Sequence, residues 1–158
     1  MSNISMTTSK RNAIVTVMLI SAVVSMLNQT ILNTALPAII KGLNITETTA
    51  QWLITGFMLV NGIMIPLTAF LMDKYSTRHL YIFSMAIFLI GSIVAAFSPT
   101  FTILMISRII QAIGAGILLP LMQFTVFTLF PAEQRGFAMG LAGVVVQSAP
   151  AIGPTLTG

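Results

Sequence analysis

The sequence contains no cysteine, and only 6% of its 158 residues are charged. Without cysteine, the chain forms no disulfide and no thiolate metal site. A soluble domain typically has about a quarter of its residues charged, whereas this chain has three acids and seven bases. So few charges do not cover a water-soluble globule of this size, and we expect lipid to be the solvent for most of the chain.

The chain is also poor in groups that carry out chemistry. Three acids and one histidine leave little material for a hydrolytic site, and the apolar stretches hold no acid pair, metal cluster or nucleophile with a base. The formal net charge of +4 comes from bases scattered along the chain without a basic face, which argues against nucleic-acid binding. We therefore expect no enzyme activity, cofactor, metal or nucleic-acid partner.

Hydrophobic residues make up 56% of the chain and gather in long stretches. A helix needs about 20 apolar residues to cross about 30 Å of hydrocarbon, and no stretch alternates with period two. The sequence predicts an all-α polytopic membrane protein with a cytoplasmic tail at 1–12. Its five spans are expected at about 13–36, 52–72, 80–97, 101–130 and 136–158. The fourth is long enough to tilt, kink at Pro120 or extend beyond the membrane.

The connections between spans are predicted to be short, with residues 37–51 linking the first two. Ser98 is expected to cap the fourth helix, with Pro99 at its first position. A cytoplasmic N-terminus places five bases inside and one outside, which follows the positive-inside rule. The inner bases are Lys10, Arg11, Lys74, Arg78 and Arg135, and the outer one is Lys41. The first span is too long for a signal peptide, so we expect it to remain as a permanent span. We expect the whole to be a multi-pass protein of a bacterial cell membrane.

Arg108 is the most informative polar residue within the spans. It lies roughly 10 Å below the outer end of the fourth span, where a guanidinium costs on the order of 2.5–3.5 kcal/mol on insertion scales. It should therefore face a cavity or a partner, and Gln111 lies on the same face of the helix. The alternative is that Arg108 reaches the outer interface by snorkelling.

The first span carries five polar residues within seven positions: Asn28, Gln29, Thr30, Asn33 and Thr34. Polar side chains between membrane helices can act as simple contacts, worth about 0.6 kcal/mol each in some measurements. Five so close together favour the lining of a water-filled path. Asn61 and Gln147 are isolated, and for both we expect interhelical contacts.

The fifth span is interrupted by small residues and prolines: Gly140, Gly143, Pro150, Gly153, Pro154 and Gly158. Such a helix must pack against others, so it is predicted to act as a hinge or occlusion helix. The loop between the second and third spans contains Asp73, Lys74 and Arg78. These charges either anchor the topology or form a gate, which requires partial burial.

Four segments resemble signatures of the drug:proton antiporters of the major facilitator superfamily, most closely its fourteen-span branch. Residues 27–37 resemble the first-helix motif, with Asn28 in place of the family's aspartate. Residues 69–79 are similar to the loop motif between helices two and three; Asp73, Lys74 and Arg78 match it, whereas Ala69, Ser76 and Thr77 depart from it. Residues 104–116 resemble the fourth-helix motif through Arg108 and Gln111, and residues 149–158 resemble the antiporter motif centred on Gly153-Pro154.

The resemblance implies two six-helix bundles with two extra helices, of which this chain supplies helices one to five. It implies alternating access, with inward proton flow driving drug efflux. Arg108, Gln111, Asn28 and Asn33 are the expected proton-coupling and cavity residues, although Asn28 cannot titrate. Asp73, Lys74 and Arg78 are the expected cytoplasmic gate, and Pro150, Gly153, Pro154 and Gly158 the antiporter motif.

The expected partners are membrane lipid, protons, a drug-like small molecule and a C-terminal half of the same protein. The chain ends within its fifth predicted span, and a two-fold repeat needs at least one further span. We therefore expect a longer polypeptide truncated in helix five. Two alternatives remain open at this point. One is an exporter of a metabolite, peptide or sugar on the same fold, and the other is a truncated membrane protein without transport activity.

Overall fold

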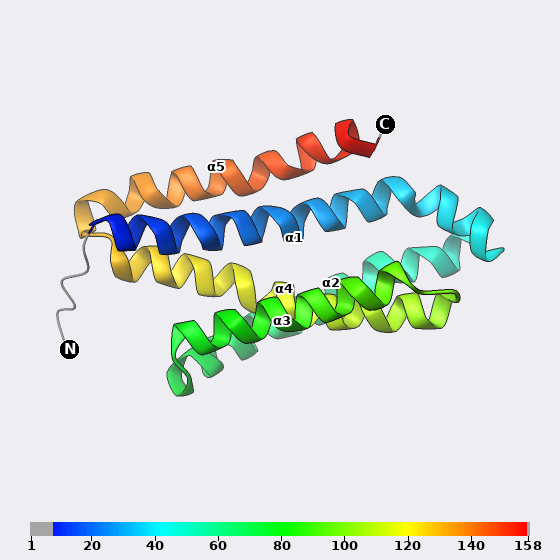
Figure 1. Cartoon of the computed structure of the whole chain (residues 1–158), viewed down its shortest axis with the longest axis horizontal. Helices are drawn as coiled ribbons and strands as arrows, with labels where there is room; N and C mark the ends of the chain where they lie inside the picture. Colours follow the sequence, from blue (N-terminus) through cyan, green and yellow to red (C-terminus); the bar gives the residue numbers. More distant parts are fainter. Residues whose placement is uncertain (1–7, 158) are drawn as a thin grey trace.

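The computed structural model describes the backbone of residues 8–157 and the side chains of residues 8–151. This part of the chain forms five helices and no strand (Figure 1). They are α1 (Thr8–Leu43), α2 (Glu47–Lys74), α3 (Thr77–Ala96), α4 (Phe101–Leu129) and α5 (Ala132–Thr157). Successive turns lie at alternate ends of the bundle, as Figure 1 shows. The all-α prediction is confirmed.

Four of the described helices, α1 to α4, are long and apolar enough to cross a membrane. Their most apolar windows have mean hydropathies of 1.8 to 2.0, and their outward faces carry large apolar side chains such as Leu59, Ile63 and Leu89. Lipid rather than water suits such a surface. Judged on its described residues, α5 does not meet this criterion. A fifth span at 136–158 therefore stays a prediction.

The helices are longer than the apolar stretches that predicted them. α1 continues through Pro37 to Leu43, and only three residues separate it from α2, with Asn44 in the left-handed region at a φ of 51°. Residues 37–51, predicted to connect the first two spans, are therefore largely helical. An apolar stretch marks the part of a helix that lies in hydrocarbon, whereas backbone hydrogen bonding continues into the polar residues that follow.

The turn between α3 and α4 also differs from the prediction. Thr100, not Ser98, caps α4: its Oγ1 accepts a hydrogen bond from the Ile103 amide at 3.4 Å. The Ser98 hydroxyl instead donates to the Ala95 carbonyl at 2.7 Å, which satisfies an acceptor at the end of α3. Pro99 lies before the helix rather than in its first turn.

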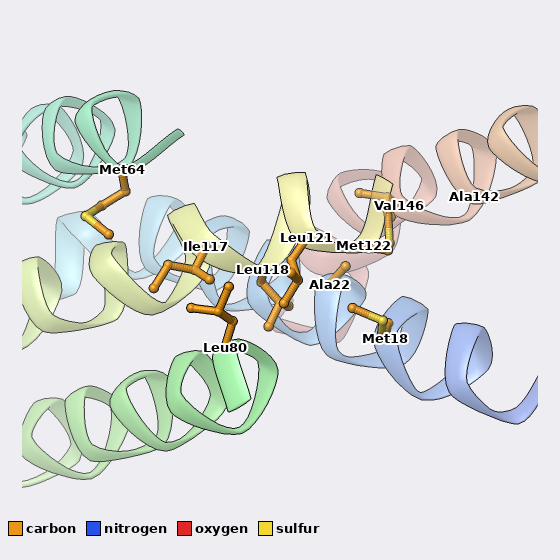
Figure 2. Close-up of a cluster of buried hydrophobic side chains, with 10 residues drawn as sticks. All are labelled: Met18, Ala22, Met64, Leu80, Ile117, Leu118, Leu121, Met122, Ala142 and Val146. Carbon is orange, nitrogen blue, oxygen red and sulfur yellow. The ribbon is translucent and has the colours of Figure 1, made fainter. Parts of the chain in front are cut away.

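α4 is the central element of the bundle. In its most apolar window 56% of the residues are buried, compared with 28% or less in α1, α2 and α3. The main apolar core gathers around its middle (Figure 2), where side chains from all five helices meet. The core residues are Met18, Ala22, Met64, Leu80, Ile117, Leu118, Leu121, Met122, Ala142 and Val146.

Glycines let neighbouring helices approach α4 closely. A Cβ added at Gly114 would lie 2.6 Å from the Ser84 carbonyl oxygen of α3, and one at Gly116 would lie 2.5 Å from Met64 Cβ of α2. The Thr68 hydroxyl also donates to the Gly116 carbonyl at 3.2 Å. Gly114 and Gly116 therefore mark the places where α3 and α2 cross α4 closely.

Candidate functional site

Arg108 lies in the interior of α4, and only 3% of its surface is exposed. Its Nη1 donates to Asn28 Oδ1 of α1 and to Gln111 Oε1 of α4, both at 2.8 Å. Its guanidinium carbon lies 4.4 Å from the centroid of the Phe57 ring of α2. The head group is held between three helices, so the alternative of an arginine that reaches the outer interface is wrong.

The hydrogen bonding continues from Gln111 to α3. Gln111 is 1% exposed, and its Nε2 donates to Ser92 Oγ at 3.0 Å. The Ser92 hydroxyl in turn donates to the Phe88 carbonyl at 2.8 Å. Residues from four helices thus form one cluster around the guanidinium. We refer to Asn28, Phe57, Ser92, Arg108 and Gln111 as the Arg108 cluster.

No carboxylate of this chain belongs to the cluster. The three acids of the sequence are Glu47, Asp73 and Glu133, and they lie in the first turn of α2, at its C-terminal end and in the first turn of α5. Within the described chain, the guanidinium therefore has neutral amides and an aromatic ring as partners, and its buried Nε has none.

The energetic terms around Arg108 explain how a cation persists there. Burial of an unpaired charge is costly, and hydrogen bonds to a charged group recover about 1.5–3 kcal/mol each. A desolvated cation–π contact adds about 2 kcal/mol. The cluster therefore holds a positive charge, without an acid of its own, among helices long enough to cross a membrane. An ionisable residue in that setting is a functional-site candidate.

The clustered polar residues of α1 do not share one environment. Asn28 is partly buried and contacts Arg108. Thr30 and Thr34 donate to carbonyls of their own helix, at 3.1 Å each. Asn33 is exposed and lies about 7.5 Å further along the helix than Asn28. Of the two asparagines predicted as site residues, the structure brings only Asn28 to the guanidinium.

Asp73, Lys74 and Arg78 lie around the turn between α2 and α3, and all three are exposed. The Lys74 ammonium lies 4.6 Å from the centroid of the Phe70 ring. Arg78 lines an apolar cavity of about 610 Å³ between α1, α3 and α4. The described residues that line this cavity do not include any member of the Arg108 cluster. The gate stays a prediction, because the burial that it requires is not present around these exposed side chains.

The antiporter-motif residues lie towards the C-terminal end of α5. Pro150 is exposed. Gly153 and Pro154 lie within the helix, but their side-chain surroundings are outside the described part of the structure, as is Gly158 altogether. The hinge or occlusion role of this segment therefore stays a prediction.

Sequence reasoning missed two members of the cluster, Phe57 and Ser92. One of ten phenylalanines carries no signal by itself, and the contact with Arg108 depends on how α2 crosses α4. Ser92 did offer a signal, because it is a hydroxyl in an otherwise apolar stretch of α3. Helical spacing from Arg108 could not have found it, since it lies on another helix.

The family model described as Major Facilitator Superfamily matches residues 18–158. The chain belongs to this superfamily. The match covers all of the Arg108 cluster, and it identifies a multi-pass membrane transporter family rather than an enzyme family. The resemblance first seen in four short motifs thus extends over most of the chain.

Relatives within the superfamily include proteins named for drug resistance. The Uncharacterized MFS-type transporter YcnB of Bacillus subtilis is 55% identical over 94% of this chain and 31% of its own length. The Lincomycin resistance protein LmrB of Bacillus subtilis is 44% identical over 89% of the chain and 29% of its own length. The Probable multidrug resistance protein EmrY of Escherichia coli is 35% identical over 84% of the chain and 26% of its own length. The chain thus spans less than a third of each relative's length.

Proposed function

We propose that this superfamily chain is part of a transporter that exports drug-like amphipathic compounds by alternating access, driven by inward proton flow. The Arg108 cluster is the observation that carries the proposal. A buried cation with two neutral acceptors and no acid of its own is poised to respond when a negative charge or a proton acceptor approaches. Relatives named for lincomycin and multidrug resistance support drugs as the cargo.

In this mechanism Arg108 biases the protonation of an acid that approaches it during transport. Asn28 holds the guanidinium in place but cannot itself take up a proton. The predicted spans of this chain contain no acid. The proton-carrying acid is therefore contributed from outside these spans. Asp73 with Arg78 would close the cytoplasmic side in one conformation, and the glycines and prolines of α5 would let that helix bend.

Drug-dependent proton flux tests the proposal. The complete polypeptide that carries this chain is placed in inverted membrane vesicles, and proton movement is recorded when a drug panel including lincomycin is added. We expect flux with the unaltered protein and its loss in Arg108→Ala, with membrane insertion unchanged. Retained flux in that variant would remove Arg108 from the mechanism, and an absence of drug response in the unaltered protein would contradict drug export.

A further inference from the structure

We infer that Ser92 of α3 is a positioning residue for Arg108: its hydroxyl sets which way the Gln111 amide points, and the amide in turn holds the guanidinium. Neither the motif resemblance nor the superfamily match assigns a role to Ser92. The inference follows from the direction of the hydrogen bonds around Gln111. Its consequence for transport rests on the function proposed above.

The Ser92 hydroxyl has its proton already in use. It donates to the Phe88 carbonyl one helical turn back at 2.8 Å, so the oxygen presents a lone pair towards α4. A lone pair accepts from the amide nitrogen of Gln111, and the 3.0 Å contact with Nε2 is of this kind. The Phe88 carbonyl thereby determines that Ser92 is the acceptor, and not the donor, in its hydrogen bond with Gln111.

The amide has only one orientation that satisfies both of its neighbours. With Nε2 on Ser92, Oε1 is left to accept from Arg108 Nη1 at 2.8 Å. A turn of the amide by half a revolution would set the NH₂ group against the guanidinium, and both groups are donors only. Because Gln111 and Arg108 are almost fully buried, water does not readily replace the lost partners, and unsatisfied groups there are costly.

Gly91 explains why α3 comes close enough for this contact. A Cβ at this position would lie 2.8 Å from Gln111 Cγ and 2.9 Å from the Gln111 backbone nitrogen. The missing side chain therefore lets the backbone of α3 lie directly against Gln111, which sets Ser92 beside the amide. A shift of α3 along α4 would separate Ser92 from the amide and release Gln111 to turn. The position of α3 is thus linked to the hold on Arg108.

A double-mutant cycle in the complete protein in lipid nanodiscs tests the inference. The thermal unfolding midpoint is measured for Ser92→Ala, Gln111→Leu and the double variant. If Ser92 acts through Gln111, the fall caused by Ser92→Ala shrinks or vanishes when Gln111 is already leucine. Ser84→Ala is the matched control, because Ser84 is a buried serine of the same helix that donates only to its own backbone at Tyr81. Its effect should be the same in both backgrounds.

Transport gives the second readout. Ser92→Ala should lower the maximal rate of drug efflux by about twofold to tenfold, the range for one net hydrogen bond, and leave the half-saturating drug concentration unchanged. Ser92→Thr keeps the hydroxyl and should restore the rate. Additive unfolding effects of Ser92→Ala and Gln111→Leu, or a threonine variant no better than alanine, would overturn the inference. Coupled unfolding in a protein that moves no drug would uphold the positioning and contradict the proposed function instead.

Discussion

Arg108 Nη1 donates a hydrogen bond to Asn28 Oδ1 at 2.8 Å, although the two residues lie 80 positions apart in the sequence. The first-helix motif that this chain resembles has an acid at the position of Asn28. Here the same position supplies a neutral acceptor, so the contact between α1 and α4 is a charge-assisted hydrogen bond and not an ion pair. This difference makes the charge state of the cluster testable by substitution.

Asn28→Leu should destabilise the protein, because it leaves a buried guanidinium donor without its partner. The expected loss is about 1–3 kcal/mol, measured as the free energy of unfolding in denaturant titrations of the detergent-solubilised protein. Asn33→Leu is the control, since Asn33 is an exposed asparagine of the same helix. Equal losses in the two variants would show that the contact with Arg108 contributes nothing particular.

Asn28→Asp should place a carboxylate within reach of the guanidinium and raise the unfolding midpoint above that of the unaltered protein at neutral pH. The gain should disappear in acid, where protonation of the new carboxylate removes its charge. Asn33→Asp serves as the comparison, because its carboxylate lies about 7.5 Å further along the helix. A midpoint that rises equally for both aspartates would point to a general charge effect.

Phe57→Leu should cost more than an ordinary change of a buried phenylalanine to leucine. It removes the ring that lies 4.4 Å from the Arg108 guanidinium, a contact worth about 2 kcal/mol when desolvated. Phe88→Leu provides the baseline for lost volume, because Phe88 is a buried phenylalanine of α3 that packs near the same region. Equal unfolding free energies for the two variants would contradict a cation–π contribution.

Gly114→Ala should destabilise the helix crossing, whereas Gly62→Ala should not. A Cβ at Gly114 meets the backbone carbonyl oxygen of Ser84 at 2.6 Å, whereas one at Gly62 meets nothing within 4 Å. Overpacking typically costs about 1–3 kcal/mol, and alanine in an open helical position gains up to about 1 kcal/mol over glycine. Thermal unfolding of both variants compares the two positions directly.

The sequence predicted the helical class, the four long apolar helices and the proximity of Arg108 to Gln111 on one helix face. These features depend on local composition and on the cost of a cation in lipid, which a single sequence displays. It did not predict the continuation of α1 beyond Pro37, the cap at Thr100 or the roles of Phe57 and Ser92. Those depend on hydrogen bonding at helix ends and on how neighbouring helices cross, which no local pattern reports.

The proposed function requires that Asn28, the partly buried member of the Arg108 cluster on α1, becomes open to water and substrate in at least one transport state of the complete transporter. This chain contains no cysteine, so Asn28→Cys is labelled in a complete transporter in which any cysteine outside the chain has been replaced. Ala22→Cys, at a fully buried position of the same helix, is the control. A membrane-impermeant thiol reagent should modify position 28 and not position 22, and added drug should change the rate at 28. If position 28 stays unmodified in every transport state, the account is contradicted.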